Sequence, residues 1–320
     1  MSASRYQRIA AQASALGCRH FRDVPLSAHT TWRIGGPADL MLVPPDVGQL
    51  APLLALLSRE ELPVLVIGAG SNLLFSDAGV RGVVIKIESN LSRISIEGNR
   101  VTAEAGAWIP RLARNSAAAG LTGLEHAIGI PGTLGGLLVM NGGSRRENIG
   151  SRIVAVDALT MQGEAVRLSR EECRFGYRTS LFQKGGLVVV RGELELEAGD
   201  RRTIRRDMLS ILRERRAKFP LKEPSCGSVF LSDQALFPQA GPPGKLIEDA
   251  GLKGVSLGDA QVSTRHANFI VNRGRATSRE VASLICLVRE KVAAASGVAL
   301  NCEVRYVDEQ CRLTAVPRGE

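Results

Sequence analysis

The sequence predicts an α+β protein with a strand-rich first part and a more helical last third. Three observations support this class: short apolar runs that end in glycine-rich turns, β-type segments spaced as hairpins, and amphipathic helical patterns that begin after residue 200. With 320 residues, 44% of them hydrophobic and 23% charged, the chain can bury a sizeable core and is expected to divide into two or three domains.

The first part opens with a helical pattern, predicted to be peripheral, and continues with strands and turns. The apolar run 62–67 predicts a buried strand that leads into the turn from Gly68 to Asn72. A helix is predicted from Ile109 to Ala119, with its end at Gly120. Further strands and hairpins are predicted over 83–87, 94–96 with 101–105, 154–161 with 165–168, and 187–196.

The last third contains two predicted helices. From 201 to 218 apolar residues recur at helical spacing, and Pro220 ends the pattern. The final helix is predicted to begin at a capping box formed by Thr277 and Glu280 and to end at Gly297.

The charge and composition favour small anionic ligands. The net charge is +9, from 41 Lys and Arg against 32 Asp and Glu, which suits an anionic partner. The basic residues are scattered apart from two groups within 201–216, and only 4% of residues are aromatic, so phosphate-bearing small molecules are favoured over nucleic acid. The 34 glycines gather in short runs, where the backbone can approach a ligand closely.

Cysteine usage and the N-terminus indicate the compartment. The six cysteines show neither CxxC pairing nor the Cys/His spacing of a zinc site, so we expect free thiols, a reducing compartment and no metal. The N-terminus lacks the apolar core of a signal peptide, and no stretch approaches the roughly 18 apolar residues of a membrane span. We expect a cytoplasmic protein with no membrane or nucleic-acid partner.

Two glycine-dense loops are the strongest chemical signals. The first, from Gly68 to Asn72, begins like a dinucleotide fingerprint, but Leu73 stands where the third glycine belongs, and no P-loop lysine follows. It is either a plain strand turn or a nest of backbone N–H groups suited to a diphosphate. The second loop runs from Gly129 to Gly136, and two such loops can enclose a long dinucleotide from both sides.

Ten motifs in chain order resemble those of the UDP-N-acetylenolpyruvoylglucosamine reductase (MurB) family, and together they span nearly the whole chain. They are 31–38 (TWRIGGPA), 66–74 (VIGAGSNLL), 129–136 (GIPGTLGG), 141–143 (NGG), 177–180 (YRTS), 227–230 (GSVF), 250–254 (AGLKG), 260–263 (AQVS), 266–269 (HANF) and 303–304 (EV). The resemblance implies an FAD-binding PCMH-type (vanillyl-alcohol-oxidase-like) fold. It implies an N-terminal helical extension at 1–20, FAD-binding subdomains at 21–90 and 91–205, and a C-terminal α+β substrate-binding domain at 206–320.

The resemblance also implies an activity in peptidoglycan precursor synthesis. NADPH would reduce a non-covalently bound FAD, which would then reduce UDP-GlcNAc-enolpyruvate to UDP-N-acetylmuramate. A monomer is expected. The alternatives are another FAD-dependent oxidoreductase of the same fold and a nonredox nucleotide-sugar binding protein.

Three residues match the catalytic positions of the family. Ser228 would donate a proton to the substrate carbon, Arg178 would stabilise negative charge that spreads onto the substrate carboxylate, and Glu303 would hydrogen-bond the same region as a protonated or proton-sharing acid. From the residues alone, Ser228 and Arg178 also suit ordinary loop positions. Glu303 lies on a strand predicted over 298–307, where it could simply pair with Arg305.

Binding residues follow from the same motifs. Arg33 lies in an apolar context predicted to be extended, so an anionic partner is expected for its charge. The residues expected to bind FAD are Arg33, Gly68, Ala69, Gly70, Ser71, Asn72, Gly129, Gly132, Thr133, Gly135, Gly136, Asn141 and Gly142. Those expected to bind substrate are Tyr177, Lys218, Lys245, Gln261 and His266.

The sequence also departs from the family pattern. Residues 231–238 replace the Lys-Asn-Pro that commonly follows the Gly-Ser-x-Phe motif, so the family pattern does not define the geometry of the loop over 231–245. The segment between Tyr177 and Leu187 is too short for the extra tyrosine-bearing loop of one subclass. We therefore expect the subclass that lacks this loop.

Overall fold

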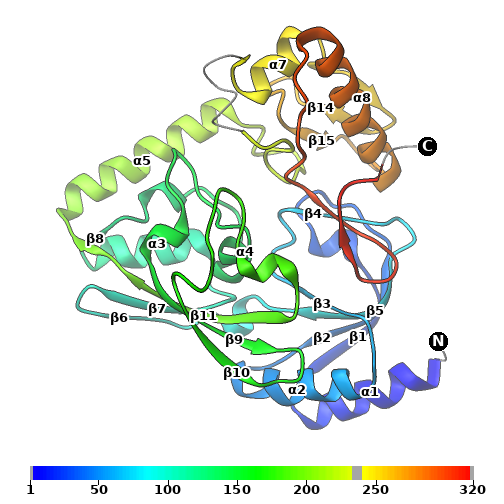
Figure 1. Cartoon of the computed structure of the whole chain (residues 1–320), viewed down its shortest axis with the longest axis vertical. Helices are drawn as coiled ribbons and strands as arrows, with labels where there is room; N and C mark the ends of the chain where they lie inside the picture. Colours follow the sequence, from blue (N-terminus) through cyan, green and yellow to red (C-terminus); the bar gives the residue numbers. More distant parts are fainter. Residues whose placement is uncertain (1–2, 233–239, 318–320) are drawn as a thin grey trace. The chain divides into compact units, whose positions relative to one another are not determined.

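The computed structural model describes residues 3–232 and 240–317, and the chain forms two compact units (Figure 1). Unit 1 comprises Met1–Arg22, Leu40–Ala69 and Val83–Glu214, and unit 2 comprises Asp23–Asp39, Gly70–Gly82 and Arg215–Glu320. Both units combine helices with sheets, so the α+β class is confirmed. The finer domain boundaries at residues 20, 90 and 205 stay a prediction.

An antiparallel five-stranded sheet forms the centre of unit 1. Both predicted hairpins are confirmed, since Ile94 pairs with Ala103 and Ala165 pairs with Leu159. The short helix α4 (Leu134–Val139) packs on this sheet through buried leucines. The strand order is β10 (Ala165–Ser169), β9 (Ile153–Thr160), β11 (Leu187–Glu195), β7 (Arg100–Glu104) and β6 (Ile94–Glu97).

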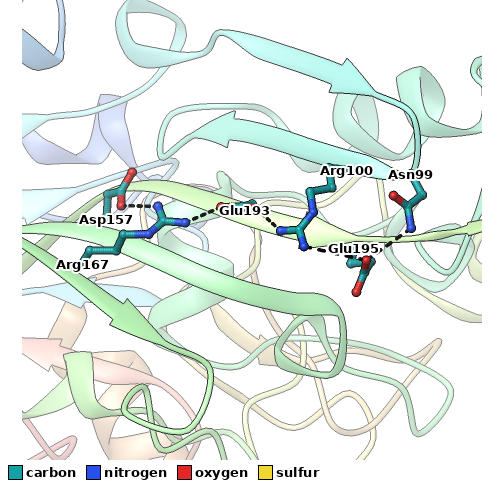
Figure 2. A network of polar contacts seen from close by, with 6 residues as sticks. All are labelled: Asn99, Arg100, Asp157, Arg167, Glu193 and Glu195. Atoms are coloured by element: carbon teal, nitrogen blue, oxygen red, sulfur yellow. Dashed lines mark hydrogen bonds and ion pairs between the residues drawn. The ribbon is translucent and has the colours of Figure 1, made fainter.

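The face of this sheet opposite α4 is charged. Residues of β11 alternate, so Gly192 lies against the leucines of α4 while Glu193 points to the other face. There Glu193 accepts hydrogen bonds from both Arg100 and Arg167, and Arg167 also pairs with Asp157 at 2.8 Å. Figure 2 shows the network on neighbouring strands, which comprises Asn99, Arg100, Asp157, Arg167, Glu193 and Glu195. These arginine hydrogen bonds hold the pKa of Glu193 below its usual value, which favours its ionised form.

A second sheet supports the first glycine loop. Its strand order is β1 (Arg19–Pro25), β2 (Pro37–Val43), β5 (Val80–Lys86) and β3 (Val64–Ile67). Strands β3 and β5 are parallel, with Ile67 beside Lys86. Helices α1 (Ala3–Ala15) and α2 (Val47–Arg59) contribute to the same hydrophobic core as this sheet (Figure 1). Ile9 of α1 is fully buried, whereas Gln7, Arg8 and Gln12 are exposed, so this first helix packs on the core through one face.

The remaining elements of unit 1 follow the sequence pattern. Helix α3 (Ile109–Ala118) matches its prediction to within one residue. Helix α5 (Arg201–Lys218) has the predicted bounds, and its last residues, from Arg215 on, belong to unit 2. The two-residue strands β8 (Leu121–Thr122) and β12 (Glu197–Ala198) pair with each other. Single turns of 3-10 helix occur in the two units at η1 (Leu26–His29), η2 (Ser89–Leu91), η3 (Glu125–Ala127), η4 (Ile149–Arg152) and η5 (Leu181–Lys184).

Unit 2 packs a small antiparallel sheet against helices. The sheet has the order β13 (Ser256–Leu257), β14 (Ala260–Val262) and β15 (Ile270–Asn272), and the helices are α7 (Pro243–Asp249) and α8 (Ser278–Ser296). Both hydrogen bonds of the capping box at the start of α8 are present, which confirms that prediction. Gly297 ends α8 with φ 71°, a left-handed conformation that a residue without Cβ adopts without strain.

The strand predicted over 298–307 is wrong for most of its length. Only β16 (Arg305–Val307) is a strand, and it pairs with β4 (Leu73–Phe75) in parallel and with β17 (Leu313–Thr314). Before it, the chain pairs instead with residues 229–231, through single backbone hydrogen bonds on either side of Cys302. The segment changes partner midway, so no continuous ladder forms. Leu300 and Val304 of this segment are nevertheless buried.

In the described part of the chain, no helix is both long and apolar enough to cross a membrane.

Candidate active site

The two glycine loops touch each other in unit 1. Gly68 follows β3, and a Cβ at this position would lie 2.3 Å from the Oγ1 of Thr133. Thr133 belongs to the second loop, where its hydroxyl caps α4 by accepting a hydrogen bond from the Gly136 N–H at 3.4 Å. Only glycine permits this approach, because any side chain at 68 would push the loops apart.

The first loop offers backbone donors for an anion. The N–H groups of Ala69 and Ser71 donate to no acceptor among residues 3–232 and 240–317. Successive N–H groups of this kind form the concave sites that bind phosphates. Free donors of this kind are compatible with the diphosphate nest, one of the two interpretations of the loop, and binding of FAD by these residues stays a prediction.

Asn72, at the end of this loop, has a further role that the motif did not indicate. Its side-chain Nδ2 donates to the backbone carbonyl of Glu303 at 3.2 Å, and its own carbonyl accepts from the Arg305 N–H at 3.1 Å. Asn72 therefore links the loop to the segment that carries Glu303. Asn72, Glu303 and Arg305 all belong to unit 2.

A buried histidine, which the sequence did not single out, precedes the second loop. His126 is 2% exposed, and neither of its ring nitrogens has a hydrogen-bond partner within the described residues. Burial lowers the pKa of its imidazole to about 4; nearby Glu125 opposes this shift, and Arg152 and Arg178 add to it. The ring is therefore neutral at neutral pH.

Arg178 stands at the tip of a tight turn in unit 1. Gly176 and Thr179 exchange backbone hydrogen bonds of 3.0 and 3.2 Å, and Arg178 has φ 53°, in the left-handed region that non-glycine residues rarely occupy. Its Nη2 donates to the carbonyl of Gly143 at 2.9 Å. The half-buried guanidinium is thus held in place, unlike that of a solvated loop arginine.

Asn141 anchors this turn. Its side chain is buried, donates to the Gly176 carbonyl at 2.8 Å and accepts from the Gly150 N–H at 2.9 Å. Both ends of the amide are therefore engaged by the protein, and direct contact with flavin stays a prediction. Tyr177 is 50% exposed, and the Arg178 guanidinium lies 5.6 Å from the centre of its ring.

In unit 2 the structure brings the Ser228 and Glu303 segments side by side. The Glu303 N–H donates to the carbonyl of Val229 at 2.8 Å, which places it one residue from Ser228. Both Ser228 and Glu303 are half-buried. These two sequence-predicted residues therefore lie on neighbouring segments, whereas Arg178 belongs to unit 1.

Asn268, which the sequence did not single out as a site residue, holds the Ser228 segment. Its amide is 3% exposed and bonds both backbone groups of Phe230 at 2.9 Å, while its own carbonyl accepts from the Val229 N–H. A signal was present, since Asn268 is a polar residue within an apolar run of a family motif.

The predicted substrate residues of unit 2 have varied surroundings. Lys245 is exposed and paired with Asp249 at 2.8 Å, so its charge is already partly balanced. The Gln261 amide donates to the Gly254 carbonyl at 3.1 Å and to the Ser256 hydroxyl at 3.0 Å. Lys218 is exposed at the end of α5.

His266 lies in an aromatic cluster, with its ring centre 5.2 Å from that of Phe219 and 5.1 Å from that of Phe269. Its Nδ1 accepts a hydrogen bond from the Asn268 N–H at 3.2 Å. Burial lowers its pKa, and the nearby Lys218 and Lys253 lower it further. A neutral ring held this way can offer Nε2 to a ligand, and that role stays a prediction.

One premise about Arg33 is wrong. Its backbone has φ 58° in place of the expected extended conformation, and its side chain is exposed. An exposed guanidinium is solvated by water, so it needs no anionic partner within the protein. Binding of flavin by Arg33 stays a prediction. The departure from the family pattern at 231–238 lies mostly outside the described residues, which exclude 233–239.

No group of three His, Cys, Asp or Glu side chains that could hold a metal ion occurs within residues 3–232 and 240–317. Residues 38–169, which include both glycine loops, match the family model described as FAD binding domain, so the fold and its loops are those of an FAD-binding protein. Residues 219–307 match the model of the UDP-N-acetylenolpyruvoylglucosamine reductase C-terminal domain.

Similar proteins extend this match over most of the chain. UDP-N-acetylenolpyruvoylglucosamine reductase 1 of Corynebacterium glutamicum is 43% identical over 90% of this chain and 86% of its own. The reductase of Heliobacterium modesticaldum is 45% identical over 89% of this chain and 90% of its own. The crystal structure of MurB from Thermus caldophilus superposes with a TM-score of 0.77 at 33% identity, covering 90% of this chain and 99% of that one. The chain therefore belongs to the UDP-N-acetylenolpyruvoylglucosamine reductase family.

Proposed function

We propose that this chain is a UDP-N-acetylmuramate dehydrogenase, which uses NADPH and non-covalent FAD to reduce UDP-GlcNAc-enolpyruvate to UDP-N-acetylmuramate for peptidoglycan synthesis. The observation that carries the proposal is the similarity to curated reductases over about nine tenths of the chain, at identities of 43% and 45%. We further propose that the enzyme is a cytoplasmic monomer, without a nucleic-acid or membrane partner.

The reaction adds one hydride and one proton across the enolpyruvyl double bond. Bound FAD, once reduced by NADPH, would supply the hydride to one carbon of that bond. The electron pair of the former double bond then resides on the neighbouring carbon, which takes a proton from the Ser228 hydroxyl. A serine hydroxyl is a weak acid, so it donates only to a strongly basic carbon in a fixed geometry. Support for fixed geometry comes from the Asn268 hydrogen bonds that hold the next two residues.

Arg178 and Glu303 stabilise the charge that develops during this step. Electron density from the reacting carbon spreads onto the substrate carboxylate, and a guanidinium matches that planar anion with two donors. The Arg178 guanidinium donates to the Gly143 carbonyl, which keeps it from reorganising during the reaction. Glu303 assists by donating a proton or a shared proton to the same carboxylate region.

Different residues bind the cofactor and the substrate in this proposal. The N–H groups of Ala69 and Ser71 suit the FAD diphosphate, and the remaining glycines of both loops allow close approach of the backbone. For the UDP-linked substrate and NADPH we retain Tyr177, Lys218, Gln261 and His266, and we rank Lys245 below them because Asp249 engages its ammonium.

The test is a two-step anaerobic experiment. The purified protein is reduced with NADPH, UDP-GlcNAc-enolpyruvate is then added, and the flavin absorbance at about 450 nm is followed. Prompt reoxidation with formation of UDP-N-acetylmuramate supports the proposal. A flavin that stays reduced contradicts the substrate assignment and favours another flavin-dependent oxidoreductase. A protein without flavin contradicts the proposal altogether and favours a nucleotide-sugar binding protein.

A further inference from the structure

A buried lysine that the proposed reaction does not use lies under the first glycine loop. Lys86 ends strand β5 in the run Val83-Val84-Ile85-Lys86-Ile87, and its side chain is only 7% exposed. Lysine is rarely buried unless its ammonium is paired, since removing the charge from water is costly. Burial lowers the pKa of Lys86, whereas the nearby Glu88 raises it. Because burying the Lys86 ammonium costs free energy, its position needs an explanation beyond packing.

Lys86 contacts the first residue of the first glycine loop. Its Nζ donates a hydrogen bond of 2.7 Å to the carbonyl of Gly68 and lies 3.0 Å from the Oε1 of Glu88. The Glu88 side chain is 45% exposed, so water screens the ion pair more than it screens the bond to Gly68. The buried partner of the ammonium is therefore the peptide unit that opens the loop.

The other end of that peptide unit is the Ala69 N–H. The described peptide bonds include no cis bond, and in a planar trans peptide the C=O and N–H point in opposite directions. Lys86 therefore contacts one side of the unit, while the Ala69 N–H points away from it and has no acceptor in the described part of the chain. A cation bound to the carbonyl polarises the amide, which makes the N–H a stronger donor.

The position of this peptide is held from a second direction. Gly68 lies so close to Thr133 of the second loop that a Cβ would meet its hydroxyl at 2.3 Å. Thr133 limits movement on one side and the Lys86 ammonium draws the carbonyl toward β5. Together they set the direction of the Ala69 N–H before any ligand binds.

We propose that Lys86 is a positioning residue for FAD: its ammonium orients and polarises the Gly68–Ala69 peptide so that the Ala69 N–H binds the FAD diphosphate. This inference rests on the proposed function, because it takes FAD as the ligand of the loop. Lys86 acts through the peptide and through its positive charge, and it need not touch the cofactor itself.

The test measures release of FAD from the purified holoenzyme, followed as the rise in flavin fluorescence after dilution. Lys86→Gln keeps a neutral donor of similar length but removes the charge, and it should release FAD about tenfold faster. Lys86→Met removes both the donor and the charge, and it should release FAD about 100-fold faster. Glu88→Gln is the matched control, because it alters only the half-exposed partner, and it should stay within about threefold of wild type.

Two results would overturn the proposal. Wild-type release from Lys86→Gln would mean that the charge is irrelevant and that Lys86 is only a structural tie. Equal acceleration by Glu88→Gln and Lys86→Gln would mean that the ion pair, not the bond to Gly68, matters. If Lys86→Met does not fold, Lys86→Gln still decides, since it retains the packing and a donor. A wild-type protein that carries no FAD would instead contradict the proposed function.

Discussion

Replacing Asn268 tests whether one buried amide controls the geometry of Ser228. In Asn268→Ala, the N–H and the carbonyl of Phe230 both lose their 2.9 Å hydrogen bonds to the side chain. Phe230 is 1% exposed, so water cannot replace them without opening unit 2. Each buried group left without a partner costs about 1–3 kcal/mol, and for the two groups we expect a total loss of about 2–6 kcal/mol in the stability of unit 2.

The assay uses the distribution of tryptophans. The chain has two, and Trp32 is the one in unit 2, where it is fully buried and donates to the Ile270 carbonyl at 2.8 Å. In a Trp108→Phe background, urea unfolding followed by fluorescence therefore reports on unit 2. Reduction of the enolpyruvyl substrate, measured well below the unfolding transition, should fall about 10- to 100-fold because Ser228 loses its fixed position.

A matched control separates stability from geometry. Asn272 is also a buried asparagine of unit 2, and its amide bonds the Trp32 carbonyl and the N–H groups of Gly274 and Ala276, each at 3.0 Å. Asn272→Ala should lower stability to a similar degree but leave the substrate reaction of the folded protein near wild type. A stability loss below about 1 kcal/mol in Asn268→Ala, or equal kinetic effects of the two variants, would refute the reasoning.

Three further predictions concern the reaction, the glycine contact and pH. Ser228→Ala should bind FAD and oxidise NADPH normally while the reduced flavin no longer reduces the enolpyruvyl substrate; turnover like wild type, measured by product formation, would exclude Ser228 as the proton donor. Gly68→Ala places a Cβ 2.3 Å from the Thr133 hydroxyl and should weaken FAD binding at least about tenfold by titration, whereas unchanged affinity would mean that the two loops need not touch. For His126 the folded pKa of about 4 lies below the ordinary value of 6.5, so the unfolded chain binds more protons between these values. Stability should therefore be fully present above pH 6.5 and fall as the pH drops toward 4, with His126 contributing about 3 kcal/mol to the total loss. Urea midpoints across this range should show a shallower slope in His126→Phe, and an identical slope would contradict the neutral buried state.

Elements with local signals could be predicted from the sequence. The capping box of α8, its glycine end and both hairpins of the five-stranded sheet depend on residues a few positions apart, and all are present. The family motifs identified the MurB family, which the similarity over most of the chain confirms. Such features depend on short-range geometry or on an ordered set of motifs, so tertiary context is not needed to find them.

Elements whose backbone partner is distant could not be predicted. The segment before β16 alternates apolar and polar residues as a strand does, yet it changes partner between residues 229–231 and 73–75. Arg33 was expected in an extended segment, but it adopts φ 58° in a turn. In both cases the local pattern of side chains carried no information about which backbone groups would pair.

The candidate site also has a part that the sequence predicted and a part that only the structure shows. Residue types in motifs nominated Ser228, Arg178 and Glu303, and their catalytic roles stay predictions. The supporting contacts came only from the structure: Asn268 is 38 positions from Phe230, and Lys86 is 18 positions from Gly68. A lysine within an apolar strand was a visible signal, but its partner was not.

By itself the sequence determined the α+β class, the helix ends and hairpin turns, and the family, and it nominated residues for the chemistry. Tertiary structure alone decided that the two glycine loops touch, that Glu303 pairs beside Ser228, and that Lys86 and Asn268 hold backbone groups near them. The physical reason is that local propensity depends on nearby residues, whereas a buried polar group must find a partner wherever folding brings one within hydrogen-bond distance.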